Sequence, residues 1–528
     1  MNNLNFLVDV LKDSPVFKTL EKNVKPGRTV CASGLSTINK SNIIYALCCL
    51  KGVTAFCLAS DEKEAQTLCN DLSCMGLRAY VYPVRDFNFL DFQSRSHEYE
   101  HARLKVLLKL INHECDVAIA CVDAAAQLTV PRNVLEQSVI EFEEGRELSL
   151  EKATKALTLL GYERFDAVEG SGQFSLRGGI LDFFMPDSDY PVRCEFWGDE
   201  ITDLSYFDIE TQRRFKKADK ITLSPSTEIV IEDRAALADK IEHKAKLLRS
   251  KNSAKAKEKL FSEAELIRSG AMIANADKFI NQIYDKPESL FDYLDRNTLV
   301  FASEFTAIQE RGKSMDFISN ETLMQGFEDG TLCRGFDRFA LTFNECTEFL
   351  QSHGTIVLEN FVHGSMPIKL SEIISFSTKQ LSAWGGSYKQ LKEDVDGLFT
   401  PESKGVIFAG TERAAKNLCD TFNADGINAV YSEGADKISK GELLVMQGAL
   451  SAGFEYPSQK FFAITYSQVS YRPEKSKKKK KKTGQEIYSL SELAPGDYVV
   501  HNVHGIGVFG GIRTVSYTHL RAHETRRH

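Results

Sequence analysis

The strongest constraint on the fold is an alternation of short apolar runs and amphipathic stretches between residues 28 and 130. The runs RTVCAS, VTAFCLA, AYVYP and DVAIACV have the length of buried strands, and segments with helical spacing separate them. Parallel strands need such helical crossovers, so the alternation predicts a parallel sheet covered by helices. Asp61 is the expected N-cap of one helix, and Gly76 follows its expected end.

Length and composition narrow the class of protein. A chain of 528 residues exceeds what one hydrophobic core supports, so several domains are expected. No run of eighteen apolar residues occurs and the start has no basic n-region, so we expect a cytoplasmic protein without a membrane contact. The net charge of −8 argues against DNA as the main partner of this part. Twelve cysteines without a C-x-x-C pair or zinc spacing predict buried thiols and no metal site.

The pattern changes after residue 130. An amphipathic helix from Ser149 to Leu160, closed by Gly161, precedes several strands with period-2 alternation, which predicts a small α+β module. Residues 233–285 are strongly helical, and a second small α/β unit occupies residues 366–468.

The basic stretch SYRPEKSKKKKKKTGQE favours a disordered linker, because six consecutive lysines repel one another and bury nothing. A sequence-independent contact with DNA phosphates is the alternative interpretation.

A nearly complete phosphate-loop motif follows the first strand and leads into a helix expected from Lys40 to Leu50. It runs from Gly34 to Asn39, Lys40 and Ser41, and fits G-x-x-x-x-G-K-[ST] except that Asn39 replaces the second glycine. In a working loop the lysine would contact phosphates and the serine would bind Mg²⁺. The Cβ of Asn39 crowds the place where the backbone must approach phosphate, which favours a degenerate loop. Asp123, at the end of the DVAIACV run, is either a metal ligand or a helix cap.

The module contains a candidate binding face. Alternation along its strands places Arg177, Arg193 and Trp197 where they could share one exposed face, a combination typical of interface hot spots. The alternative is that Trp197 belongs to the core and that the arginines are solvated or pair with Asp199 and Glu200.

The C-terminal segment L-x-P-G-D-Y-V-V-H-x-x-H-G-I-G predicts two strands, with Gly505 and Gly507 at the turn between them. His501 and His504 have no accompanying cysteine or acidic ligand, so we interpret them as structural histidines.

The stretch with GYER, EGSGQFSLRGGILDFF, YPVRCEFWGDEI and FDIETQRR resembles the domain shared by the excinuclease component UvrB and the transcription-repair coupling factor family. The resemblance implies that this domain docks onto the excinuclease component UvrA, and that Arg177, Arg193 and Trp197 match residues of that contact, with Trp197 at a position where phenylalanine is more usual. It also implies a D-E-x-H box near residues 298–305, where Ala302 and Ser303 stand in place of the two acids.

These departures favour the coupling factor over UvrB, because that family's N-terminal region resembles UvrB without ATP hydrolysis. Residues 487–515 resemble the start of its small β-barrel that binds the β subunit of RNA polymerase. The resemblance implies an α/β multidomain fold: a degenerate P-loop, helicase-like parallel-sheet domain with an inserted α+β module, a second small α/β domain and a partial β-barrel at the C-terminus.

The expected division has seven segments: 1–129, the first part of the degenerate α/β domain; 130–215, the UvrA-binding module; 216–365, the continuation of the α/β domain with a helical insert; 366–468, the small α/β domain; 469–486, the lysine-rich linker; 487–515, the truncated barrel; and 516–528, a basic tail outside the family.

The implied function is transcription-coupled nucleotide excision repair, with this chain as the part that recruits UvrA. The family's ATP-driven DNA translocase, which uses ATP and Mg and contacts DNA, has no recognisable counterpart in the chain. We therefore assign no catalytic residue, metal ligand or cofactor. The competing hypotheses are a UvrB-like ATPase that uses residues 34–41, and a DNA-binding protein that uses the lysine-rich linker.

Overall fold

A computed structural model of the chain describes residues 4–85, 97–138, 140–249, 253–270, 276–362, 366–385, 387–466, 498–501 and 505–508. The chain divides into two units, Met1–Arg472 and Pro473–His528. Within the described residues, no helix is long and apolar enough to cross a membrane.

The predicted parallel sheet is confirmed and has seven strands in the order β15-β1-β14-β13-β2-β4-β3, all parallel. Its strands are β1 (Val30–Ser33), β2 (Ala55–Ala59), β3 (Ala79–Tyr82), β4 (Val117–Cys121), β13 (Leu299–Ser303), β14 (Thr355–Leu358) and β15 (Glu372–Ser375). Strand β15 lies inside the range assigned to the second small domain, yet it pairs with β1 in this first sheet.

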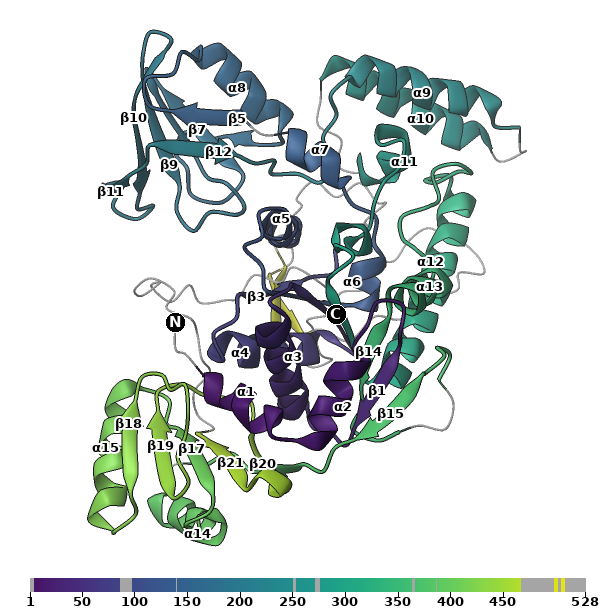
Figure 1. Ribbon diagram of the computed structural model, residues 1–528. Coiled ribbons are helices and arrows are strands. Elements are labelled where there is room, and N and C mark those ends of the chain that lie inside the picture. Colours follow the sequence, from purple (N-terminus) through teal and green to yellow (C-terminus); the bar gives the residue numbers. More distant parts are fainter. Residues whose placement is uncertain are drawn as a thin grey trace. The chain divides into compact units, whose positions relative to one another are not determined.

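Helices cover both faces of this sheet (Figure 1). They are α1 (Asn5–Lys12), α2 (Pro15–Asn23), α3 (Thr37–Lys51), α4 (Glu62–Cys74), α5 (Glu98–Ile111), α6 (Val122–Ala126), α7 (Arg132–Gln137), α12 (Phe305–Asp329) and α13 (Phe343–His353). Alternate residues of β2 enter different cores: Ala55 and Cys57 face one cluster, whereas Phe56 and Leu58 face the other. The predicted cap is also present, because the Asp61 carboxylate accepts a hydrogen bond from the Glu64 amide at 2.7 Å.

The predicted α+β module has its own core (Figure 1). Helix α8 (Leu150–Leu159) ends at Gly161, whose φ of 87° confirms the expected left-handed conformation. A six-stranded sheet has the order β11-β10-β9-β8-β7-β6, and β5 pairs separately with β12. The strands are β5 (Ile140–Glu143), β6 (Glu163–Arg164), β7 (Gln173–Arg177), β8 (Ile180–Phe183), β9 (Val192–Trp197), β10 (Glu200–Phe207), β11 (Arg214–Lys217) and β12 (Lys220–Leu223).

A buried ion pair lies at the place where the chain passes from the first domain into the module and back. Two nitrogens of the Arg103 guanidinium donate to one carboxylate, with Nε 2.6 Å from Glu228 Oε1 and Nη2 3.3 Å from Oε2. Thr129, just before the module, donates its hydroxyl to Glu228 Oε2 at 2.7 Å. All three residues are buried, so the two crossings of the chain are fixed to α5 by one carboxylate.

The predicted helical insert is a hairpin of α9 (Arg234–Leu247) and α10 (Ser253–Ser269), which lie side by side (Figure 1). Shorter helical segments follow it: η1 (Ala276–Phe279), α11 (Ile280–Ile283) and η2 (Leu290–Tyr293).

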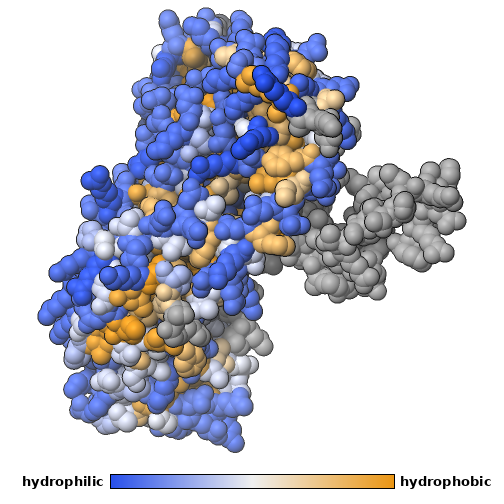
Figure 2. Space-filling view, turned by 90° about the vertical axis from the view of Figure 1, so that its right-hand side faces the viewer, coloured by the Kyte–Doolittle hydropathy of each residue, from blue (hydrophilic) through white to orange (hydrophobic). Residues whose placement is uncertain are grey.

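The second α/β domain has a mixed sheet in the order β16-β20-β21-β17-β19-β18. Its elements are β16 (Lys379–Leu381), α14 (Tyr388–Leu398), β17 (Lys404–Phe408), α15 (Glu412–Ala424), β18 (Ala429–Ser432), β19 (Glu442–Met446), β20 (Gly453–Tyr456), η3 (Pro457–Gln459) and β21 (Phe461–Thr465). Hydrophobic residues are scattered in separate patches over the visible face of the molecule (Figure 2).

The C-terminal unit, Pro473–His528, contains two antiparallel strands, β22 (Tyr498–His501) and β23 (Gly505–Val508). The predicted pair of strands is thus present, but the placement of the glycines in the turn is wrong. Gly505 begins β23 opposite His501, and Gly507 pairs with Val499 inside the strand. The lysine-rich linker, His504 and the basic tail lie outside the described residues.

Candidate functional site

The register of β7, β8 and β9 brings the predicted binding residues onto one face of the module. Asp182 of β8 lies opposite both Ser175 of β7 and Arg193 of β9. Side chains two residues apart along a strand point to the same side, so Arg177 and Trp197 share this face with Arg193. The prediction of a common face is therefore supported by the strand pairing.

A buried carboxylate joins the two arginines. Arg177 Nη2 donates to Asp182 Oδ2 at 2.7 Å, and Arg193 donates to both carboxylate oxygens at 2.7 and 2.8 Å. Only 1% of the Asp182 side chain is exposed, against 50% for Arg177 and 13% for Arg193. The hydrogen bonds with Asp182 raise the pKa of Arg193 above its ordinary value and so hold it in the charged form.

Arg193 also binds the loop that follows β10. Its Nη1 donates to the Gln212 carbonyl at 3.1 Å and its Nη2 to the Gln212 side-chain oxygen at 3.2 Å. Its guanidinium lies over the ring of Phe207, with the central carbon 4.4 Å from the ring centroid. Arg193 therefore links a strand, an aromatic side chain and a loop inside the module.

Trp197 is 81% exposed, so the alternative that it belongs to the core is wrong. The arginines also pair with Asp182, not with Asp199 or Glu200 as the alternative proposed. A large aromatic side chain in water, on the same face of the sheet as two charged arginines, is unusual for a surface without a partner.

A second ionic group on the same sheet was not predicted from the sequence. Arg214 of β11 forms ion pairs with Glu195 of β9 and, at 2.8 Å, with Asp203 of β10. This group places one guanidinium between two carboxylates, whereas the first places one carboxylate between two guanidiniums. Neighbouring parts of one sheet thus carry opposite net charge.

The phosphate-loop motif leads directly into helix α3. Helix α3 begins at Thr37, three residues before the Lys40 start that the motif predicts, and the Lys40 amide donates to the Ser36 carbonyl at 3.0 Å. Asn39 lies in the first turn of this helix, where its side-chain oxygen accepts a hydrogen bond from the Ser36 hydroxyl at 2.6 Å. The amides of Gly34 and Leu35 donate to the carbonyls of residues 360 and 359. Three of the amides in this motif, those of Gly34, Leu35 and Lys40, are therefore already bonded within the chain.

Gly34 has a structural reason to be glycine. Its φ is 80°, and a Cβ at this position would lie 2.2 Å from the carbonyl oxygen of Phe376. The close approach of that carbonyl excludes any side chain, independently of a nucleotide.

Lys40 is only 2% exposed, and its ammonium group is surrounded by acceptors of the chain. Its Nζ lies 3.3 Å from Glu64 Oε1, 2.9 Å from Ser303 Oγ and 2.5 Å from Glu304 Oε1. Glu304 has a φ of 56°, a strained conformation for a residue with a Cβ, which its carboxylate bond to Lys40 helps to hold. Glu304 and Glu64 thus supply carboxylates to Lys40, whereas Ala302 and Ser303 stand at the two acidic positions that the resemblance implies.

A third carboxylate lies beside this group. Burial, and then the negative charge of Glu304, raise the pKa of Glu359 to about 7. Burial acts in the same direction on Glu64, but the charge of Lys40 and hydrogen bonds from Ser303 and Ser60 bring its pKa below the ordinary value. These carboxylates escaped sequence reasoning because each follows a different strand or lies on a different helix.

Ser41, whose hydroxyl would bind Mg²⁺ in a working loop, contributes to the contact between the two α/β domains. Its hydroxyl lies 3.3 Å from Asp71 Oδ2, and Asp71 also accepts hydrogen bonds from the Ser451 amide and hydroxyl, each at 2.7 Å. The next residue, Asn42, accepts a hydrogen bond from the Tyr456 hydroxyl at 2.9 Å. The α3 segment after Lys40 is therefore an interdomain joint.

Asp71→Asn should alter the pH dependence of stability. Burial raises the pKa of Asp71 to about 6 from 3.8, while the bonds from Ser451 and Ser41 offset part of that rise. The pKa of Asp71 is higher in the folded chain than in the unfolded chain, so its contribution to the free energy of unfolding is complete below about pH 4. That contribution falls by about 3 kcal/mol as the pH rises through 6. The asparagine variant should match or exceed the native urea midpoint at pH 7.5 and lose this slope between about pH 4 and 6. A variant markedly weaker at pH 7.5 would contradict the argument.

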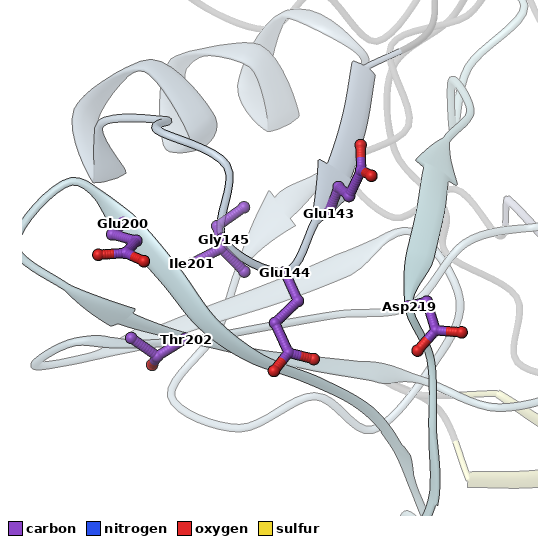
Figure 3. Close-up of a pocket in the computed structure, with 7 residues that line it drawn as sticks. All are labelled: Glu143, Glu144, Gly145, Glu200, Ile201, Thr202 and Asp219. Carbon is purple, nitrogen blue, oxygen red and sulfur yellow. The ribbon is translucent and has the colours of Figure 1, made fainter.

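Asp123, the other acidic candidate, is paired with a cation of the chain. Asp123 makes a two-bond ion pair with Arg311, at 2.9 and 2.7 Å, and lies in the first turn of α6. Glu143, Glu144, Glu200 and Asp219 line a surface recess between β5, β10 and β12 (Figure 3). In the part of the chain that the structure describes, no cluster of histidine, cysteine or acidic side chains has the arrangement of a metal site.

Two domain families match the chain. The family model of the UvrB interaction domain matches residues 140–229, which include the whole face described above. The family model of the CarD-like/TRCF RID domain matches residues 493–526, which include β22 and β23. This second match extends into residues 516–528, so it does not support a family boundary at residue 515.

Curated relatives cover most of the chain. The transcription-repair-coupling factor of Bacillus subtilis is 28% identical over 521 residues, covering 96% of this chain and 44% of that protein. The factors of the same name from Staphylococcus epidermidis and Staphylococcus aureus USA300 are 26% and 23% identical, over 83% and 98% of this chain and 38% and 45% of those proteins. The chain thus spans less than half the length of these relatives. Together, the two domain matches and these relatives show that the chain is similar to the N-terminal region of transcription-repair-coupling factors.

Proposed function

We propose that this chain recruits UvrA during transcription-coupled nucleotide excision repair, through the face that carries Arg177 and Trp197. The observation that supports this most is the combination of an 81% exposed Trp197 with an arginine pair on a buried carboxylate. The face lies inside the match to the UvrB interaction domain, and its residues are those that the resemblance assigns to the UvrA contact.

The chemistry of the face suits a protein partner. Tryptophan and arginine dominate the binding energy of protein interfaces, because both bury a large area and arginine adds directed hydrogen bonds. Most of the Trp197 side chain would become buried only on association with a partner, whereas a tryptophan in the core would bury no further area.

We also propose that residues 34–41 bind no nucleotide. Phosphate binding would need free amides and a free ammonium group. The Lys40 amide already donates to the Ser36 carbonyl, and the Lys40 ammonium group already donates to the Glu304 carboxylate. The ATPase hypothesis would require both to rearrange. ATP and Mg²⁺ would then act in the family's motor, outside this chain.

The C-terminal unit supports a further partner of the same pathway. Strands β22 and β23 lie within the match to the CarD-like/TRCF RID domain, so we propose that this segment contributes to binding of the β subunit of RNA polymerase. All twelve cysteines are free thiols, which suits the reducing cytoplasm where these partners work.

Trp197→Ala should weaken binding of the chain to purified UvrA by more than about tenfold in calorimetry, the loss typical of a central aromatic anchor. Phe317→Ala is the matched control, because Phe317 is also a largely exposed aromatic residue (66%) but lies on α12, outside the module. Equal binding by the Trp197 variant, or no binding by the unmodified chain, would remove the proposed function.

A further inference from the structure

We propose that Asp182 and Arg193 are positioning residues and that Arg177, held by them, is the arginine that contacts the partner together with Trp197. This inference rests on the proposed recruitment function. It separates two arginines to which the family resemblance gives the same role.

The bonding of Arg193 directs it inward. Four hydrogen bonds from its guanidinium end within the module, two on Asp182 and two on Gln212, and one face of the group covers the Phe207 ring. A guanidinium has five N–H donors, so little donor capacity is left for a partner. With 13% of its side chain exposed, Arg193 also offers little area for contact.

The bonding of Arg177 directs it outward. Half of its side chain is exposed, and within the described residues its one hydrogen bond is from Nη2 to Asp182. A guanidinium is planar, so the donors of Arg177 that have no hydrogen bond among the described residues fit a carboxylate with two parallel bonds. The partner surface opposite Arg177 is therefore expected to present an acidic side chain.

Asp182 connects the two roles. One oxygen accepts from Arg193 alone and the other from both arginines, so the carboxylate fixes the Arg177 guanidinium relative to the sheet. A free arginine side chain loses considerable rotamer freedom when a partner immobilises it. Holding Arg177 before the encounter reduces that loss, and the net positive charge of the three groups remains available to an acidic partner.

A double-mutant cycle measured with purified UvrA and the full chain tests this arrangement. Arg177→Ala should lower the association constant by about tenfold or more, and Asp182→Asn should lower it by several-fold. If Asp182 acts through Arg177, Asp182→Asn should have little further effect in the Arg177→Ala chain. Asp116→Asn is the matched control, because Asp116 makes a comparable two-bond pair with Arg78 outside the module and should leave binding unchanged.

The second measurement is the melting temperature of the chain, because replacing a residue that only contacts the partner would leave it unchanged. Arg193→Ala should lower the melting temperature of the chain, whereas Arg177→Ala should not. The positioning role would be overturned if Asp182→Asn lowered the association constant by the same factor with and without Arg177. It would also be overturned if an Arg193→Ala chain no longer bound UvrA but kept its melting temperature. Absence of binding by the unmodified chain would instead reject the recruitment function itself, and this inference with it.

Discussion

Arg103→Ala is expected to lower the free energy of unfolding by about 3–5 kcal/mol, the cost of leaving a buried carboxylate without its main partner. Arg103 and Glu228 are both fully buried, and their closest atoms lie 2.6 Å apart. Glu228 would retain Arg85, whose nearest nitrogen is 3.6 Å away, and the hydroxyl of Thr129. These contacts replace only part of the lost bond, because neither supplies the two directed donors of Arg103.

The measurement is urea unfolding of the two chains at pH 7.5. Lys155→Ala is the matched control, since Lys155 and Glu151 form a pair at 2.6 Å on an exposed surface of α8, and such pairs contribute little to stability. Arg103→Met combined with Glu228→Gln should recover part of the loss, because no charge is then left buried. An Arg103→Ala loss as small as that of the control would show that water or Arg85 compensates fully.

The position of this pair also gives it a consequence for function. Thr129 and Glu228 lie on the two chain segments that join the module to the first domain, and they are bonded to one another and, through Glu228, to α5. Loss of Arg103 should therefore weaken the attachment of the module to the first domain without changing the binding face of the module. Binding to UvrA is expected to survive under conditions in which Arg103→Ala is still folded.

The sequence predicted the strands of the parallel sheet well, because strands buried on both faces are continuous apolar runs that need no information about their neighbours. The runs around Cys57 and Ile119 correspond to β2 and β4. Local capping chemistry was equally readable, as at Asp61 and Gly161. The common face of Arg193 and Trp197 followed from alternation within one strand.

Contacts that depend on register or sheet order could not be predicted. Asp182 meets Arg193 only because β8 and β9 pair in one of several registers that the sequence permits. Glu304 meets Lys40 because β13 and β1 belong to one sheet, although 264 positions separate the two residues. The helix expected from Lys40 begins at Thr37 instead, because element boundaries are the least certain part of a pattern-based prediction.

Lys40→Ala is the second change with a large expected effect, and its result separates a structural lysine from a phosphate-binding one. Lys40 is the cation between Glu64 and Glu304, with Glu359 nearby, so its removal should cost about 3 kcal/mol of stability at pH 7.5. The value is at the lower limit for a buried pair because Glu304 is partly exposed. Lys51→Ala is the matched control on the same helix, since Lys51 pairs with Glu21 at a half-exposed site.

The pH dependence of this cost has a definite sign. The pKa of Glu64 is lowered in the folded chain, so its contribution is present above its unfolded value of 4.5 and is lost as pH falls. The difference between Lys40→Ala and the native chain should therefore be largest at neutral pH and shrink below about pH 4.5, where the carboxylates can protonate. A working phosphate loop would give the reverse combination: unchanged stability without ligand, and stabilisation of the native chain by ATP with Mg²⁺ that Lys40→Ala abolishes. Nucleotide stabilisation of that kind would show that Glu304 leaves Lys40 when phosphate arrives, and would make the 34–41 loop a functional site.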